Sequence, residues 1–185
     1  MMKVMGATTT RLTFEEFERL PDQPGKRELL KGELIESPPA DFAHNEIAHR
    51  IYEVLNASLT EGHARADAMQ LGKVYHEMGY QFPGDAYVVP DVSVTHADQP
   101  VNRYLVGAPA LAIEVISSSN SAEDLATKTD LYFQHGAREV WLVYPKTRHV
   151  VVYADGVPRI VRTNETLTTL LLPGLALSVA EILGE

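Results

Sequence analysis

The sequence predicts an α/β (α+β) fold in which helices flank a mixed central β-sheet. Two observations lead to this prediction. The middle of the chain alternates an apolar strand, an amphipathic helix and a second strand, over residues 110–116, 121–135 and 139–144. Shorter β-branched runs, bounded by turn residues, stand before and after this unit, as hairpins at sheet edges do. The 185 residues show no repeat and no linker, so we expect one domain over residues 1–185.

The N-terminal third predicts a short helix, a hairpin and a long helix. Thr13 and Glu16 have the spacing of a capping box, which begins the short helix. Residues 27–37 form two extended runs around a turn at Lys31–Gly32. Apolar residues then recur at helical spacing over residues 40–60. One side of this helix should face a core, with a stripe of His44, Ile47, Ala48, Ile51, Tyr52 and Leu55.

Strands are predicted between the long helix and the central unit. Residues 64–82 have a weak pattern that favours one or two strands. Residues 87–94 are rich in β-branched side chains and predict one strand. Because Pro90 cannot donate a ladder hydrogen bond, this strand must bend or lie at an edge there.

The central helix should begin at a cap on Ser121 and end near residue 135, just before Gly136. Lys128 lies one turn after Asp124, which by itself predicts a solvated ion pair on another flank than the buried one. The predicted buried stripe contains Ala122, Leu125, Ala126, Thr129, Tyr132 and Phe133.

The C-terminal part predicts a second hairpin and a short helix. Residues 149–153 and 157–162 are β-branched runs on either side of Asp155–Gly156, a pair typical of tight hairpin turns. The apolar residues after Pro173–Gly174 favour a short final helix.

The composition narrows the class of protein. A net charge of −9, from 25 acidic residues against 16 lysines and arginines, counts against a sequence-independent DNA binder, which usually shows a basic face. The absence of cysteine excludes disulfides and thiolate metal sites, and it fits a cytoplasmic protein. We expect no membrane span and no secretory leader, because no apolar segment of the required length occurs.

One acid in the central unit requires a specific explanation. Glu114 lies in an otherwise apolar strand, and burying an unpaired carboxylate costs several kcal/mol. It must therefore be paired, protonated, bound to metal or placed where the strand end faces a cleft. Asp91, directly after Pro90, poses a milder form of the same question. Two such acids on neighbouring strands would hold a hard cation such as Mg²⁺ or Mn²⁺.

Several motifs occur in a specific order along nearly the whole chain. They are Glu28-Leu29-Leu30-Lys31-Gly32-Glu33-Leu34-Ile35, Ser37-Pro38, His44, Val89-Pro90-Asp91-Val92-Ser93-Val94, Ile113-Glu114-Val115-Ile116-Ser117, Asp124-x-x-x-Lys128-x-x-x-Tyr132-x-x-x-Gly136, Glu139-Val140-Trp141-Leu142-Val143 and Leu172-Pro173-Gly174-Leu175. This ordered set resembles a large family of bacterial endonucleases, long labelled a domain of unknown function, in the PD-(D/E)XK, restriction-endonuclease-like superfamily. The resemblance implies a restriction-endonuclease-like domain whose site core spans residues 28–144.

The resemblance also implies a metal-dependent catalytic site. Asp91 and Glu114, with the carbonyl of Val115, would bind Mg²⁺ or Mn²⁺. The superfamily usually has a lysine two residues after the acid, where this chain has Ile116. The family instead takes its lysine from the following helix, which points to Lys128.

Three further residues follow from the resemblance. Glu28 would be an additional acid near the metal or on a metal-bound water. His44 and Tyr132 would lie at the edge of the site.

The same residues also have ordinary structural interpretations. Asp91 after a proline is typical of a turn or strand end, and Glu28 fits a surface position. His44 lies on an apolar stripe, so it fits a core or capping histidine. Tyr132 and Trp141 fit the core. The scattered histidines form no zinc motif of the His-Glu-x-x-His type.

Functions of different classes therefore remain open. The first is a Mg²⁺-dependent endonuclease that hydrolyses DNA phosphodiester bonds and acts as a homodimer or higher homo-oligomer. It requires a basic rim, for which the candidates are Arg11, Arg27, Lys31, Lys73, Arg103 and Arg138. The second is a catalytically inactive nuclease-fold protein that binds nucleic acid or a protein partner, which the acidic balance and Ile116 favour. Hydrolysis of a substrate other than DNA is the third.

Overall fold

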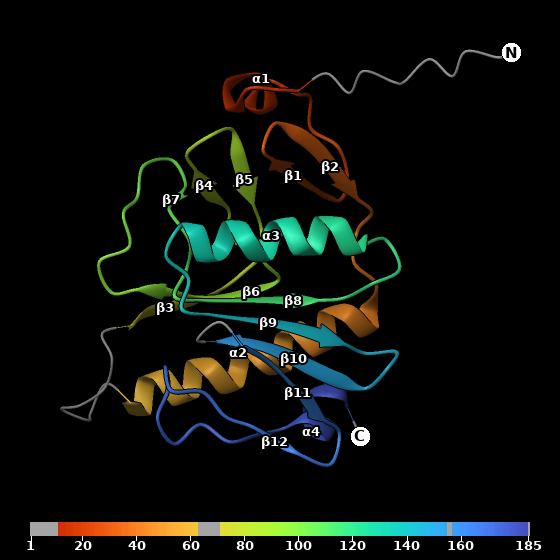
Figure 1. The fold of residues 1–185 in the computed structure, drawn as a ribbon, viewed down its shortest axis with the longest axis vertical. Helices are drawn as coiled ribbons and strands as arrows, with labels where there is room; N and C mark the ends of the chain where they lie inside the picture. The colour runs from red at the N-terminus through yellow and green to blue at the C-terminus, as the bar shows by residue number, and fades with distance from the viewer. Residues whose placement is uncertain (1–10, 63–70, 155–156, 185) are drawn as a thin grey trace, which may run out of the picture.

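The computed structural model describes residues 11–62, 71–154 and 157–184 (Figure 1). Within these ranges the helices are α1 (Phe14–Glu18), α2 (Phe42–Gly62), α3 (Ala122–Gln134) and α4 (Val179–Leu183). The strands are β1 (Lys26–Leu30), β2 (Glu33–Ser37), β3 (Leu71–His76), β4 (Tyr80–Phe82), β5 (Ala86–Val88), β6 (Val92–His96), β7 (Leu105–Val106), β8 (Leu111–Val115), β9 (Glu139–Tyr144), β10 (His149–Ala154), β11 (Val157–Arg162), β12 (Thr166–Leu167) and β13 (Leu177–Ser178).

The central sheet is mixed, as the sequence predicted. Its strand order is β11-β10-β9-β8-β6-β3, with β8 and β9 parallel and the other neighbours antiparallel. Parallel strands need a crossover connection, and α3 supplies it between β8 and β9. A second sheet, in the order β2-β1-β5-β4-β7, lies on the α3 side, and α3 contacts both β1 and β9 (Figure 1).

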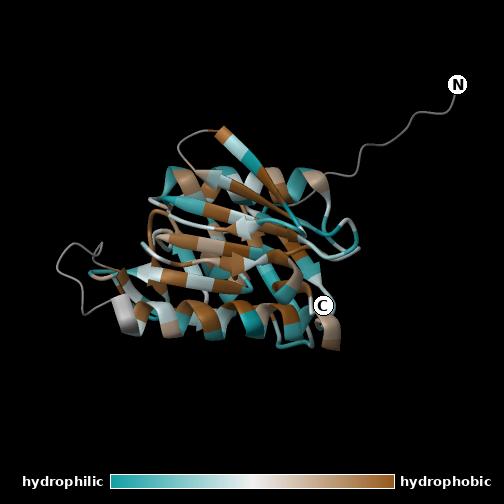
Figure 2. Ribbon diagram, turned by 90° about the horizontal axis from the view of Figure 1, so that it is seen from below, coloured by the Kyte–Doolittle hydropathy of each residue, from teal (hydrophilic) through white to brown (hydrophobic). Residues whose placement is uncertain are grey.

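The core consists of two apolar clusters, one on each face of the central sheet. In β8, Leu111, Ile113 and Val115 belong to the cluster that α2 covers, whereas Ala112 belongs to the cluster that α3 covers. Figure 2 shows this layering, with hydrophobic residues concentrated on the strands between the helices. Because successive side chains of a strand point to opposite faces, Glu114 shares the α3 side with Ala112.

Pro90 divides the predicted strand over residues 87–94 into two. β5 belongs to the second sheet and β6 to the central sheet. The prediction of one bent strand is therefore wrong, because the chain leaves one sheet and enters the other around Pro90. This crossing places Asp91 at the start of β6, next to both sheets.

The buried side of α3 differs from the predicted stripe. Ala122, Ala126 and Phe133 are exposed, which corrects that part of the prediction. The buried residues are Leu125, Lys128, Thr129, Leu131 and Tyr132. The sequence pattern placed Lys128 on another flank as a solvated lysine, whereas in the structure it is buried and ion-paired with Glu28 and Glu114.

The remaining elements agree with the predictions to within a few residues. They include α1 with its Thr13–Glu16 capping box, the β1–β2 hairpin, α2, the β10–β11 hairpin and α4. The weak region 64–82 contains β3 and β4, although residues 63–70 and the predicted turn Asp155–Gly156 lie outside the described residues. No helix in the described ranges is long and apolar enough to cross a membrane.

Two neighbouring residues of α2 test the assignment of its buried side. Leu55 is fully buried and Val54 is 40% exposed. Leu55→Ala should lower the free energy of unfolding by about 2–5 kcal/mol, because it removes buried methyl groups and leaves a cavity. Val54→Ala should change it by less than about 0.5 kcal/mol. Urea unfolding followed by circular dichroism measures both, and equal losses would contradict the assignment.

Candidate active site

Four charged residues that are far apart in the sequence come together between the two sheets. Glu28 comes from β1, Asp91 from the residue just before β6, Glu114 from β8 and Lys128 from α3. Each is only 4% exposed. Such burial is rare for charged residues unless they are paired. The contacts of each group therefore define the site.

Lys128 lies between two of the acids. Its Nζ is 2.7 Å from Glu114 Oε1 and 2.8 Å from Glu28 Oε1. The solvated pair with Asp124, the ordinary interpretation of Lys128, is not formed, since Asp124 instead accepts a hydrogen bond from the Ser121 hydroxyl. Lys128, from α3, thus contacts Glu114. In the superfamily that the sequence resembles, the lysine beside this acid usually lies on the same strand.

Asp91 is held by three groups from three segments. Lys26 Nζ lies 2.5 Å from Asp91 Oδ1. The other carboxylate oxygen, Oδ2, accepts a hydrogen bond of 2.7 Å from the backbone N–H of Val115 and lies 3.3 Å from His44 Nε2. The Val115 contact ties Asp91 directly to the end of β8, next to Glu114.

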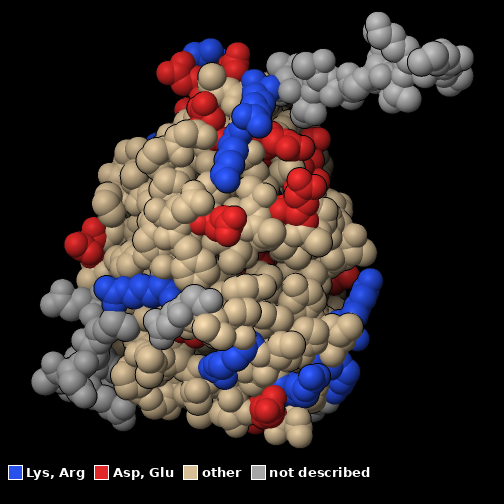
Figure 3. Space-filling model, viewed as in Figure 1, with Lys and Arg blue, Asp and Glu red and all other residues tan. Residues whose placement is uncertain are grey.

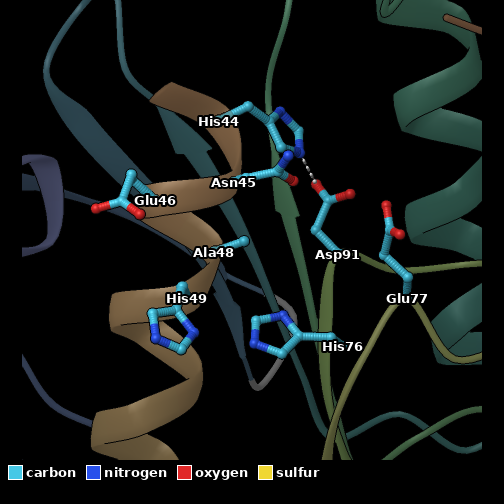
Figure 4. A pocket seen from close by; sticks show the side chains of 8 residues that line it. All are labelled: His44, Asn45, Glu46, Ala48, His49, His76, Glu77 and Asp91. Carbon is cyan, nitrogen blue, oxygen red and sulfur yellow. Dashed lines mark ion pairs between the residues drawn. The ribbon is translucent and has the colours of Figure 1, made fainter. Parts of the chain in front are cut away.

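The local sequence explains why His44 reaches this acid. Asp41 accepts a hydrogen bond from the backbone N–H of His44, 2.8 Å long, as a residue at a helix N-cap does. This contact places His44 in the first turn of α2, where its ring points towards Asp91 (Figure 4). The side chain is 16% exposed, so His44 borders the solvent-filled part of the site.

The two glutamates have further partners that fix their positions. The hydroxyl of Tyr132 donates a hydrogen bond of 2.6 Å to Glu114 Oε1. Tyr132 is fully buried, so it is both a core residue and a contact of the site acid. Glu28 Oε1 accepts a hydrogen bond of 2.7 Å from the backbone N–H of Val89, just before Pro90.

Burial and neighbouring charges shift the pKa values of these groups. Burial by itself would raise the pKa of Asp91, but the hydrogen bond from His44 and the Lys26 charge outweigh it and hold that pKa well below the usual range. The pKa of Glu114 is raised, because burial and the nearby charges of Asp91 and Glu28 outweigh the attraction of Lys128. Burial would lower the pKa of Lys128, yet Glu114 and Glu28 keep it above its ordinary value.

These groups line an open pocket of about 660 Å³. Its walls come from β1, the loop before α2, the start of β6 and the Ser117–Asn120 loop after β8. A smaller pocket of about 340 Å³ adjoins it at Asp91 and is lined by His44, His49, His76 and Glu77, among others (Figure 4). The space on the solvent side of Asp91 and Glu114 is therefore large enough for a small charged group and water.

The donor set fits a hard divalent cation. Asp91 and Glu114 offer carboxylate oxygens, the ligands that Mg²⁺ and Mn²⁺ prefer. A cation beside Glu114 would stabilise its charged form, which burial disfavours. Among the described residues no group of three or more His, Cys, Asp or Glu side chains has metal-ligand geometry. A cation here would therefore need backbone oxygen and water besides the two carboxylates.

The predicted site residues do converge in the structure. Glu28, Asp91, Glu114, Val115 and Lys128 all line the larger pocket. His44 lines both pockets, whereas Tyr132 lies behind Glu114. Two other residues that line the larger pocket, Lys26 and Glu77, were not predicted from the sequence. A signal existed for Lys26, because it precedes Glu28 by two residues and so shares its face of β1.

The basic rim is much smaller than the sequence suggested. Of the six candidate residues, only Arg27 lines the pocket, and it pairs with Glu36. Figure 3 shows the face that carries α3, where acidic side chains lie over α1 and α3, and basic side chains lie both beside α1 and near the β10–β11 hairpin. The positive charge nearest to the site is thus inside the pocket, on Lys26 and Lys128.

Comparison with known proteins now identifies the family. A model of the Uma2 family, described as "Putative restriction endonuclease", matches residues 14–180. The chain belongs to the Uma2 family. The match covers nearly all of the sequence and contains every site residue described above. Asp91, Glu114 and Lys128 are thus parts of a restriction-endonuclease-like Uma2 protein.

Solved structures support the same fold for this Uma2 protein. The crystal structure of "a putative nuclease belonging to DUF820" from Anabaena variabilis ATCC 29413 matches with a TM-score of 0.79 at 22% sequence identity. The match covers 93% of this chain and 97% of the other. No curated protein matches the chain. The structural likeness shows the shared fold, and the chemistry must be argued from the site.

Removal of the Lys128 charge tests the buried cluster of this Uma2 site. Lys128→Met should lower the free energy of unfolding in EDTA by about 3–5 kcal/mol, because it leaves buried carboxylates without a counter-charge. The double variant Lys128→Met/Glu28→Gln should lose less than the sum of the two single losses. Urea unfolding gives the cycle, with Asp130→Asn on the exposed side of α3 as control. Strictly additive losses would show that the pair does not interact.

Proposed function

We propose that this protein is a Mg²⁺-dependent endonuclease that hydrolyses DNA phosphodiester bonds. One observation carries the proposal: a lysine ammonium and two carboxylates, Lys128, Glu114 and Asp91, converge at the bottom of an open pocket. Two carboxylates can hold a metal that activates water for phosphodiester hydrolysis, and an ammonium beside them can stabilise the charge that develops on the phosphate. The Uma2 family and its nuclease description agree with this chemistry.

Asp91 and Glu114 would hold the cation, together with the backbone carbonyl of Val115. When bound, Mg²⁺ lowers the pKa of a bound water and offsets charge on a phosphate oxygen. Val115 contributes in a second way, because its N–H fixes Asp91 Oδ2 at 2.7 Å. Mn²⁺ has the same preference for oxygen ligands and would serve as a substitute.

Lys128 has an electrostatic role in this proposal. Its raised pKa keeps the amine protonated at neutral pH, so it cannot accept a proton from water as a general base. A fixed ammonium can instead orient the attacking water and stabilise the negative charge that develops on the phosphate. Its position beside Glu114 Oε1 supports this role.

Glu28 and Tyr132 act as positioning residues. Both Glu28 oxygens face the Lys128 ammonium, at 2.8 and 3.0 Å, and Oε1 also binds the Val89 N–H. These contacts favour an orienting role for Glu28 over direct contact with a metal or its water. Tyr132 in turn holds Glu114 through its hydroxyl. His44, from α2, contacts Asp91 Oδ2 and would orient this acid.

The alternative of an inactive nucleic-acid or protein binder loses one of its two arguments. Ile116 was one argument for an inactive protein, but Lys128 brings an ammonium to Glu114 from α3, which supports a lysine in the site. The acidic surface remains in favour of that alternative. An endonuclease that cuts both strands of a duplex would act as a homodimer, with one site for each strand.

A nuclease assay with paired variants tests the proposal. Supercoiled plasmid and short single- and double-stranded DNA would be incubated with the protein and Mg²⁺, Mn²⁺ or EDTA. Cleavage should require the metal and should fall at least about 100-fold in Asp91→Ala, Glu114→Ala and Lys128→Met. The matched control Asp130→Asn removes an exposed acid of α3 and should cleave normally.

Calorimetric titration with Mn²⁺ separates the two functions if no substrate is cut. Metal binding that disappears in Asp91→Ala/Glu114→Ala would support an enzyme with an unmet sequence requirement. No binding to the intact protein would count against the metal-dependent mechanism and favour the binding protein. Full cleavage by all three site variants would contradict the assignment outright.

A further inference from the structure

Lys26 occupies the part of Asp91 that a metal would need. Its ammonium is 2.5 Å from Asp91 Oδ1. The other oxygen, Oδ2, is already used by the N–H of Val115 and by His44. A cation that bound Asp91 in the pocket would therefore approach Oδ1. A divalent cation and an ammonium on the same carboxylate oxygen repel each other at such short distance, which favours displacement of the ammonium.

Each acid of the site is paired with an ammonium group without any metal. Lys26 pairs with Asp91, and Lys128 pairs with both Glu28 and Glu114. A divalent cation at Asp91 would therefore compete with an ammonium group that already occupies its Oδ1.

We propose that Lys26 is a built-in counter-ion that the divalent metal displaces from Asp91, and that the released ammonium then contacts a phosphate of the substrate. The inference rests on the proposed nuclease function, because it concerns the same Asp91. It goes further in naming a residue through which metal binding and substrate binding are coupled. In the absence of metal, the Lys26 ammonium pairs with Asp91 and is therefore not free to contact a phosphate.

Lys26 is the lysine of the site that can move. Its side chain is 18% exposed, against 5% for Lys128, which two glutamates hold. It begins β1 and lines the open pocket, so its flexible stem has room on the solvent side. Glu77 Oε1 lies 3.9 Å from its Nζ, and the Glu77 side chain is 58% exposed. An exposed acceptor therefore lies close to the Lys26 ammonium and could pair with it once it leaves Asp91.

The direction of the effect distinguishes Lys26 from an ordinary metal-site residue. Substitution of a residue that supports metal binding lowers the affinity for the metal. Substitution of a residue that competes with the metal raises this affinity. Lys26 should therefore be a position where loss of a charged side chain improves metal affinity and impairs substrate binding.

The first measurement is calorimetric titration with Mn²⁺ of the full-length protein, Lys26→Met, Lys26→Gln and Lys146→Met. Lys26→Gln retains a hydrogen-bond donor for Asp91 and serves if Lys26→Met does not fold. Either Lys26 variant should bind Mn²⁺ about ten-fold more tightly than the unaltered protein. Lys146→Met removes an exposed lysine outside the pocket and should leave the affinity unchanged.

The second measurement is the affinity for a short labelled DNA duplex in saturating Ca²⁺, by fluorescence anisotropy over a range of salt. If Lys26 contacts a phosphate, its variants should bind more weakly than Lys146→Met, which removes the same charge. The slope of log affinity against log salt should also decrease by the amount expected for about one lost phosphate contact. Equal affinities for the Lys26 and Lys146 variants would overturn the phosphate contact.

The outcomes separate this inference from the function on which it rests. If the unaltered protein and the Lys26 variants bind Mn²⁺ equally, the competition is refuted while the metal site stands. If none of the proteins binds Mn²⁺, the metal site itself fails, and the nuclease mechanism fails with it. Tighter binding by the Lys26 variants that is abolished by Asp91→Ala supports both.

Discussion

The buried Lys128 ammonium is the contact on which the rest of the site depends. It joins α3 to β1 through Glu28 and to β8 through Glu114, so one side chain links both sheets and the helix between them. Burial of charges costs free energy that only close pairing offsets. The three elements must therefore be held in one arrangement, and the same arrangement that pairs the charges also aligns the acids along the pocket.

The alternation of side chains along the strands decides which groups can meet. Leu111, Ile113 and Val115 fill the cluster beside α2, which leaves Glu114 on the side of α3. The Pro90 break brings Asp91 to the start of β6, where the N–H of Val115 binds it. The apolar packing on one face of β8 therefore determines which polar groups lie on its other face and at its end.

The sequence predicted most of the fold and the acids of the site, and its failures have a common cause. Glu114 was recognisable because an acid in an apolar run must have a partner. From the residues alone, Lys128 was assigned to a solvated flank of α3, although its spacing from Leu125 and Tyr132 is that of a buried position, and only the family resemblance pointed to it. Lys26 was not predicted at all. Periodicity records where a side chain lies along its element, whereas the partners that make burial of a charge tolerable come from distant segments.

The position of Lys128 on a helix, and not on the strand that carries Glu114, has a structural consequence. Ile116, two residues after Glu114, packs partly against the apolar cluster that α3 covers. It therefore stabilises the packing of the helix that carries Lys128. A lysine two residues after Glu114 would be held at a fixed distance from this acid by the backbone of the strand. Lys128 keeps that distance only while α3 remains packed on the sheet, through Leu131 and the Tyr132 hydroxyl on Glu114. In this protein the geometry of the site is therefore set by the packing of one helix, and a change in the core beneath α3 would move the lysine away from the acid.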